Sequence, residues 1–383
     1  MLEEKLYWLG WQLLLPGSAR QIWRLVERLG SPRKAWLASG KELIGQGGLK
    51  PETAVQLVKQ RDALELENEL ARLEENQISY LLYHEQAYPE LLRHIFDPPP
   101  GLFVRGRLLP EDNLAVSIVG SRRPTPYGLA VSEKLAKELA QAGITVVSGM
   151  ARGIDTAAHK GALQAGGRTI AVLGCGIDVI YPRENQRLYA QIISAGAVIS
   201  EFPCGSPPEA WHFPVRNRLI SGLARALVVV EAGEKSGALI TADLALEQGR
   251  EVMTVPGNIT SNLSRGPNNL IKQGARLVEG GRDVLEEIGL GTLFKPQASP
   301  TTSLALTMEE ERIYQLLSYE LVSLDVLIER TGLAASQVLS ALMFLEIKGL
   351  VNQFPGKFYT RRDAAGSKRT SPCFSEGSKK NVP

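Results

Sequence analysis

Six short apolar runs alternate with helical patterns through the middle of the chain. The runs are Val116–Val119, Thr145–Ser148, Thr169–Leu173, Val198–Ser200, Leu227–Val230 and Val252–Val255. The helical patterns between them include Leu129–Gln141, Thr156–Gln164 and Ala238–Gln248. Strands that are apolar on both faces need helices on both faces, which is the arrangement of a parallel sheet in α/β proteins. We therefore predict a Rossmann-like, doubly wound sheet over residues 115–292, with any ligand at the carboxyl ends of its strands.

The region before this domain predicts a small helical module and a lead-in. Residues 1–75 form short helical patterns, and Leu43–Ala54 is a glycine turn with Pro51 at the following helix start. This is typical of a helix-hairpin-helix or SAM-like module, whose turn amides often contact DNA. A module that only packs is an equal alternative, because its helices carry as many acids as bases. Residues 76–114 are interpreted as a linker and extended lead-in.

The region after the sheet domain predicts a winged helix over residues 305–362. A Pro/Ser/Thr-rich linker spans residues 293–304, and a capping box at Thr307–Glu310 opens the first helix. Two further helices and a tight hairpin complete the pattern. The third helix, Ala335–Lys348, carries one acid and one base, so we expect it to contact protein rather than duplex DNA. Residues 363–383 are polar and basic and are predicted to be disordered.

Composition narrows the class of protein. The 383 residues are enough for two or three domains, and a net charge of +2 means that an anionic partner must be held by local clusters. The three cysteines and four histidines are scattered, without the spacing of a zinc site. No apolar segment has the length of a membrane span, and no signal-peptide pattern is present. We expect a cytoplasmic protein without a metal or a membrane contact.

Arginines recur where predicted strands end in glycine turns. Gly120-Ser121-Arg122 follows the first strand, and Arg183 lies beyond the glycine turn of the third. A later element, Phe213–Leu223, adds Arg216, Asn217 and Arg218 behind an aromatic ring. A glycine turn before a helix aims backbone N–H groups at an anion, and guanidinium is a bidentate phosphate ligand. The combination indicates a ligand rich in phosphate that also offers flat groups to stack, which favours nucleic acid.

A small-residue turn, Glu231–Thr241, supplies further hydroxyls at a predicted helix start. It is not a P-loop, because glutamate precedes Lys235 where that motif has glycine. Ser236 and Thr241 can still contribute to an anion site. The chain also has no GxGxxG fingerprint, so no dinucleotide cofactor is predicted.

Asp155 and His159 lie one helical turn apart, which admits two interpretations. The pair could act in acid–base chemistry, or it could make structural hydrogen bonds. No nucleophile signature is nearby, so we favour the structural role. Cys175, between two glycines, is likewise interpreted as a small buried residue rather than a nucleophile.

Seven sequence blocks in this order resemble one bacterial family, the DNA-processing proteins DprA, also called Smf. The blocks are Gly120–Arg123, Ser148–Leu163, Gly174–Asn185, Phe213–Leu223, Ser236–Ala242, Val255–Asn258 and Gly266–Ala275. The resemblance implies a Rossmann-like domain that binds single-stranded DNA and loads RecA recombinase onto it during natural transformation and recombination. It also implies a homodimer without catalytic activity.

The same resemblance distributes roles among the residues of the motifs. Phosphate contacts would fall on Ser121, Arg122, Arg183, Arg216 and Arg218. Phe213 would be the stacking platform for a base. Further backbone or side-chain contacts would come from Gly120, Asn217, Ser236, Thr241 and Asn268.

A Rossmann-like nucleotide-processing enzyme of the phosphoribohydrolase, lysine-decarboxylase-like type is the alternative. Enzymes of that type resemble a PGGxGTxxE pattern, in which the glutamate serves hydrolysis. The position three after Thr241 is Leu244, which has no acid–base function, and Asp243 lies one residue early on another helix face. The missing carboxylate favours a binding protein.

Overall fold

A computed structural model describes residues 2–293, 306–317, 321–354 and 356–361 of the chain. The chain divides into two compact units, Met1–Phe294 and Lys295–Pro383. The basic tail predicted at 363–383 and nearly all of the linker predicted at 293–304 lie outside the described residues.

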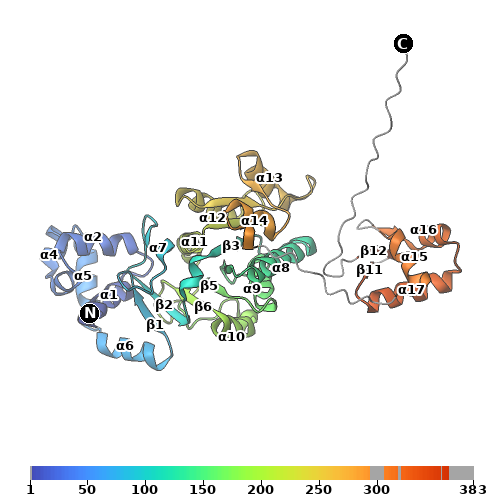
Figure 1. Cartoon of the computed structure of the whole chain (residues 1–383). Helices are drawn as coiled ribbons and strands as arrows, with labels where there is room; N and C mark the ends of the chain where they lie inside the picture. Colours follow the sequence, from blue (N-terminus) through green and yellow to red (C-terminus); the bar gives the residue numbers. More distant parts are fainter. Residues whose placement is uncertain (1, 294–305, 318–320, 355, 362–383) are drawn as a thin grey trace, which may run out of the picture. The chain divides into compact units, whose positions relative to one another are not determined.

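A nine-stranded sheet forms the centre of the first unit (Figure 1). Its strand order is β1-β2-β6-β5-β4-β3-β7-β8-β9, and the seven strands from β6 to β9 are parallel. These are β3 (Ala115–Val119), β4 (Thr145–Ser148), β5 (Thr169–Leu173), β6 (Ala197–Ser200), β7 (Ala226–Val229), β8 (Glu251–Thr254) and β9 (Arg276–Leu277). The predicted Rossmann-like fold is confirmed. Both ends of each predicted strand agree with the ends of an observed strand to within one residue.

Two antiparallel strands extend the sheet beyond β6, and they come from the segment predicted as a linker and extended lead-in. β2 (Gly101–Gly106) pairs with β6, and β1 (Ser79–Leu82) pairs with β2. The strand β1 alternates between exposed or half-buried and buried positions, as an antiparallel edge strand does. The segment predicted as a linker and extended lead-in therefore contributes two paired strands, whose place in the sheet its short extended pieces did not reveal.

Helices cover both faces of the sheet. On one face, α8 (Pro126–Gln141), α9 (Ile154–Gln164) and α14 (Gly281–Glu287) enclose a core with inward residues of β3, β4, β7 and β8. On the other face lie α7 (Glu90–Arg93), α11 (His212–Gly222), α12 (Gly237–Glu247) and α13 (Arg265–Lys272). Adjacent strand residues alternate between the two cores, for example Val146 and Val147 on β4. This alternation is why the strand sequences are apolar throughout.

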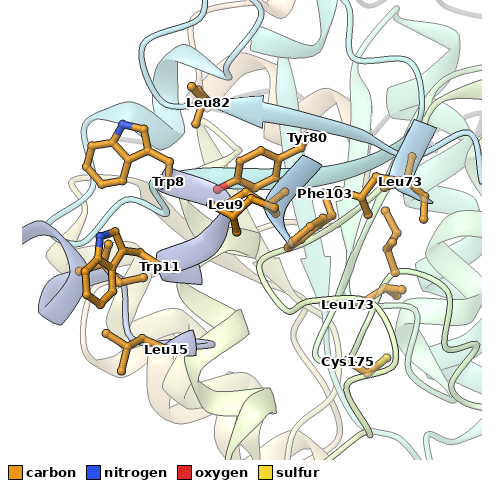
Figure 2. Close-up of a cluster of buried hydrophobic side chains, with 14 of the residues drawn as sticks. Trp8, Leu9, Trp11, Leu15, Leu73, Tyr80, Leu82, Phe103, Leu173 and Cys175 are labelled. Atoms are coloured by element: carbon orange, nitrogen blue, oxygen red, sulfur yellow. The ribbon is translucent and has the colours of Figure 1, made fainter. Parts of the chain in front are cut away.

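The helical module predicted at 1–75 is built onto the edge of the sheet. Its helices are α1 (Leu2–Leu14), α2 (Ala19–Leu29), α3 (Pro32–Leu37), α4 (Gly40–Gly45), α5 (Pro51–Arg61) and α6 (Leu66–Glu75). Trp8 and Trp11 of α1 belong to one buried cluster with Tyr80 and Phe103 of the edge strands (Figure 2), and residues of α10 (Gln186–Ala195) join the same cluster. The buried Gln12 amide donates to the carbonyls of Gly101 and Glu201. Shared core and hydrogen bonds make the module part of the first unit.

The second unit has the winged-helix arrangement that the sequence predicts. It contains α15 (Met308–Leu316), β10 (Val322–Ser323), α16 (Leu324–Thr331), α17 (Ala335–Ile347), β11 (Val351–Phe354) and β12 (Phe358–Arg361). The strands form a small antiparallel sheet in the order β10-β12-β11. The capping box at Thr307 and Glu310 is present. The third helix α17 exposes a row of large apolar side chains, Leu339, Met343, Phe344 and Ile347.

Candidate nucleic-acid interface

A pocket of about 540 Å³ opens at the carboxyl ends of the central strands. We call it the strand-end pocket. Successive strands from β3 to β6 add on one side of β3, and the chain then crosses through α11 to place β7 on the other side. Such a reversal of strand order separates the neighbouring loops and leaves a crevice for a ligand. Most predicted site residues line this pocket: Gly120, Arg122, Phe213, Arg216, Asn217, Ser236 and Thr241.

An aromatic ring flanked by guanidinium groups forms one wall. The Arg122 Cζ atom lies 4.8 Å from the centre of the Phe213 ring, and the Arg216 Cζ atom lies 5.9 Å from it. Tyr181 brings a second ring, 5.8 Å from Phe213 between centroids. A Cβ atom on Gly174 would come within 3.0 Å of Phe213, so the glycine after β5 makes room for the ring. The wall can therefore offer stacking and positive charge together.

Arg216 is buried beneath this wall and is held by carbonyl groups. Its Nη1 donates to the Gly149 carbonyl at 2.8 Å and also to the Val172 carbonyl. Burial lowers the pKa of Arg216 to about 10, while the nearby Asp155 carboxylate acts to raise it. The side chain therefore stays charged at neutral pH. A Cβ on Gly149 would lie 2.4 Å from Arg216 Nη1, so this glycine provides the space the guanidinium needs.

The first turn of α12 closes another side of the pocket. Ser236 is its N-cap, and the Ser236 hydroxyl accepts a hydrogen bond from the Ala238 amide. Asn217 Nδ2 and the Thr241 hydroxyl both donate to the Gly237 carbonyl, at 3.4 and 3.2 Å. The amide end of an 11-residue helix carries partial positive charge. Its position in the pocket adds to the potential of Arg122 and Arg216 and favours a phosphate group.

Asp155 and His159 have structural roles, as the sequence favoured. The Thr169 hydroxyl donates to the Val146 carbonyl, so it accepts a hydrogen bond from the N–H at His159 Nδ1, 2.7 Å away. His159 is fully buried, and burial lowers its pKa to about 3. Asp155 accepts from the Ala151 amide at 3.3 Å. Cys175 is also buried, and burial raises its pKa to about 11, so it is not a thiolate nucleophile at neutral pH.

Arg218 lies on the opposite side of α11, does not line the strand-end pocket, and is not placed to contact a phosphate there. Its Nη2 donates to the buried carboxylate of Glu201 at 2.7 Å, and its Nε donates to Asp97 at 3.0 Å. The side chain is 7% exposed and that of Glu201 is 2% exposed. Two acids already neutralise this guanidinium within the protein. Residues two apart on a helix face different directions, which separates Arg218 from Arg216.

Three other predicted residues do not line the strand-end pocket. The Ser121 hydroxyl accepts from the Arg123 amide and shapes the turn after β3. The side-chain amide of Asn268 brackets Gly257, donating to its carbonyl and accepting from its amide. Both side chains therefore support loops. Arg183 is exposed, two residues beyond the pocket residue Tyr181, and remains a predicted contact.

Sequence reasoning missed Tyr181 and Gly237 as pocket residues. Tyr181 follows the Gly174–Gly176 turn and precedes a proline, so an aromatic ring at a strand-end turn was the available signal. Gly237 is the first residue of α12, and only its place at the helix start pointed to the site.

Carboxylates are sparse in the pocket. Asp155 is the acidic residue among those that line it, and Asp243 lines a separate hollow beside α13. Within the described ranges, no helix has both the length and the apolar composition of a membrane span. The same ranges contain no group of three or more His, Cys, Asp or Glu side chains placed to hold a metal ion.

Comparison with known proteins gives consistent matches. Residues 79–289 match the model of the family described as DNA recombination-mediator protein A, and residues 297–357 match that of the DprA winged helix domain. Protein Smf of Synechocystis sp. is 35% identical over 94% of this chain and 99% of its own length. The DNA processing protein DprA of Bacillus subtilis is 44% identical, over 57% of this chain and 74% of its own.

A solved structure supports the same relationship. DNA processing protein A from Streptococcus pneumoniae superposes with a TM-score of 0.63 and 36% identity, covering 73% of this chain and 97% of that one. Its fold, the ordered motif blocks and the matched family model agree. This chain belongs to the DNA recombination-mediator protein A family.

Proposed function

We propose that this protein binds single-stranded DNA in the strand-end pocket without marked sequence preference. The observation that carries the proposal is the Phe213 ring with Arg122 and Arg216 beside it, at the amide end of α12. A base stacks on the ring while the guanidinium groups and helix amides bind phosphate. The structure of DNA processing protein A from Helicobacter pylori, 32% identical over 55% of this chain with a TM-score of 0.50, is described as having a unique single-stranded DNA binding mode. That description supports the same ligand here.

The shape of the pocket favours a single strand over a duplex. Its aromatic wall lies inside a recess between strand-end loops and the start of α12. Bases in a duplex are stacked on each other and do not reach such a ring, whereas bases of a single strand are free to turn into it. No element of the pocket presents an array of side chains for reading base edges.

We also propose that the protein delivers the bound strand to RecA recombinase as a homodimer in the cytoplasm, without a chemical step of its own. Family membership supports this role, and natural transformation is the process it would serve. The exposed apolar row on α17 is a candidate surface for a protein partner, consistent with the nearly neutral third helix.

Two measurements test the proposal. Fluorescence anisotropy should show tighter binding to a labelled single strand than to a blunt duplex of the same length, with a steep loss of affinity as salt rises. RecA filaments should form faster on strands coated with single-strand-binding protein when this protein is added. Equal affinity for both DNA forms would contradict the first part. Hydrolysis of nucleoside monophosphates by the purified protein would instead support the enzyme alternative.

A further inference from the structure

A second pocket, of about 500 Å³, lies among the N-terminal helices. We call it the N-terminal pocket. Its lining includes Arg20, Arg24 and Arg28 of α2, together with Gly47 and Gly48 of the turn between α4 and α5. This turn is the one whose sequence resembles a helix-hairpin-helix, and the strand-end pocket gives it no role.

The three arginines form one row along α2. They are spaced by four residues, so they share a helix face, and all are exposed. Among the described residues, none of the three forms an ion pair. Asp97 is the acidic residue in the lining, and it already binds Arg218. Like charges at this spacing repel, so an uncompensated row costs stability unless it binds an anion.

An exposed aromatic ring accompanies the row. Phe96 is 82% exposed, and the Arg20 Cζ atom lies 4.9 Å from its ring centre. The same combination, at 4.8 Å, occurs between Arg122 and Phe213 in the strand-end pocket. A phenyl ring held open to solvent beside a guanidinium group is suited to a ligand with both phosphates and bases.

Trp211 lies next to residues that line each of the two pockets. It is 48% exposed, and Pro208 and Ala210 just before it line the strand-end pocket. On its other side, a Cβ atom on Gly17 would lie 3.2 Å from the Trp211 ring, and Gly17 lines the N-terminal pocket. The indole therefore stands at the boundary between the pockets, within one compact unit, with an open surface for a base.

We propose that one DNA single strand runs from the strand-end pocket, across Trp211, onto the arginine row of α2. The proposal rests on the proposed single-strand function and extends its site. Successive arginines of the row are about 6 Å apart along the helix axis, a repeat comparable to that of phosphates in an extended strand. Short strands then occupy the strand-end pocket alone, and longer strands gain the phosphate contacts of α2.

The test compares two lengths of oligothymidylate on the full chain. Probes of about 6 and about 24 nucleotides lie on either side of the site size expected for one pocket. The variant R20Q/R24Q/R28Q removes the row, and K160Q/R225Q/K272Q removes three exposed charges elsewhere in the same unit as a matched control. We expect the first variant to bind the long probe about tenfold or more weakly and to lower its salt slope by about two, since each single-strand phosphate contributes about 0.7. Binding of the short probe should stay unchanged, as should both probes with the control.

A second variant tests the connection. Trp211→Leu should weaken the long probe more than the short one and leave the salt slope unchanged, because stacking releases no counterions. Equal long-probe binding by wild type and R20Q/R24Q/R28Q would overturn the path, as would equal losses on both probes. A loss confined to a blunt duplex would also overturn it. If wild type bound neither probe, the proposed function itself would fail, which is a different result from a path that fails alone.

Discussion

Arg216 and Arg218 stand two residues apart on α11, and the helix turns them to different surroundings. Arg216 lines the strand-end pocket, held by the Gly149 carbonyl and close to the Phe213 ring. Arg218 points into the protein and binds the carboxylates of Glu201 and Asp97. The Arg216 guanidinium lines the pocket where a ligand would bind. The Arg218 guanidinium is held in ion pairs inside the protein. The contrast indicates that residue type alone does not predict a phosphate contact, since the side chain must also line the pocket rather than be held in internal ion pairs.

The largest expected effect is on stability, and it comes from removing the buried ion pair between Arg218 and Glu201. Arg218→Ala leaves the buried Glu201 carboxylate without its partner, so we expect the free energy of unfolding to fall by about 3–5 kcal/mol. Urea unfolding followed by circular dichroism measures this. The double variant E201Q/R218M removes both charges and should recover much of the loss. A stable Arg218→Ala protein with weakened DNA binding would show that the assignment of the two faces is wrong.

A buried neutral histidine provides the next comparison, because its neighbour Arg216 is buried and charged. The folded-state pKa of His159, about 3, lies below the ordinary value near 6.5. Below about pH 6.5, His159 therefore binds a proton in the unfolded chain but stays neutral in the folded protein. The stability of the folded state falls as the pH drops through this range. We expect His159 to account for a loss of about 2 kcal/mol between pH 7 and pH 5. Unfolding titrations at both pH values measure it.

His159→Asn is the control for the pH effect. Its amide can still donate toward Thr169 but cannot titrate, so the variant should lose less stability than wild type on acidification. If wild type and His159→Asn lost the same stability on acidification, the loss would come from titratable groups other than His159.

The sequence predicted the parallel sheet well and the individual side chains less well. Thr145–Ser148 and Thr169–Leu173 match β4 and β5 because central strands need continuous apolar runs. The place of strand β1 in the sheet was not predicted because its four residues, Ser79–Leu82, are too few to give a periodic signal. The phase of α11 decides between Arg216 and Arg218, and the sequence did not reveal it, since the helix has mixed residues on both sides.

Loop supports were equally hard to distinguish from ligand contacts. Asn268 has the residue type of a phosphate contact, and only the position of Gly257 shows that it brackets a turn. The arginine row of α2 was not predicted as a site, although its four-residue spacing is present in the sequence. Its meaning depended on which groups neutralise it, and that is a property of the fold.

Within the strand-end pocket, the contributions of base stacking and of positive charge should affect different measured quantities. Phe213→Ala is expected to weaken single-strand binding by about 1–3 kcal/mol with little change in salt slope. Arg122→Ala should lower the slope by about 0.7, as one phosphate contact is lost. The neighbouring Arg123, exposed and outside the pocket lining, is the matched control, and Arg123→Ala should change either quantity less. Anisotropy titrations at four salt concentrations give both values. A slope change from Phe213→Ala as large as that from Arg122→Ala would contradict the assigned roles.

The smallest effect on DNA binding is expected from removing the second unit. The residues proposed to bind DNA lie in the first unit, which has its own cores on both sheet faces. A chain ended after residue 293 should therefore bind single strands with nearly unchanged affinity. The winged helix presents Met343, Phe344 and Ile347 instead of a basic surface on α17, which suits a protein contact. The informative comparison titrates the isolated fragment 300–363 and the whole protein with both DNA forms at low salt. Binding by the fragment as tight as that of the whole protein would move the DNA site out of the strand-end pocket.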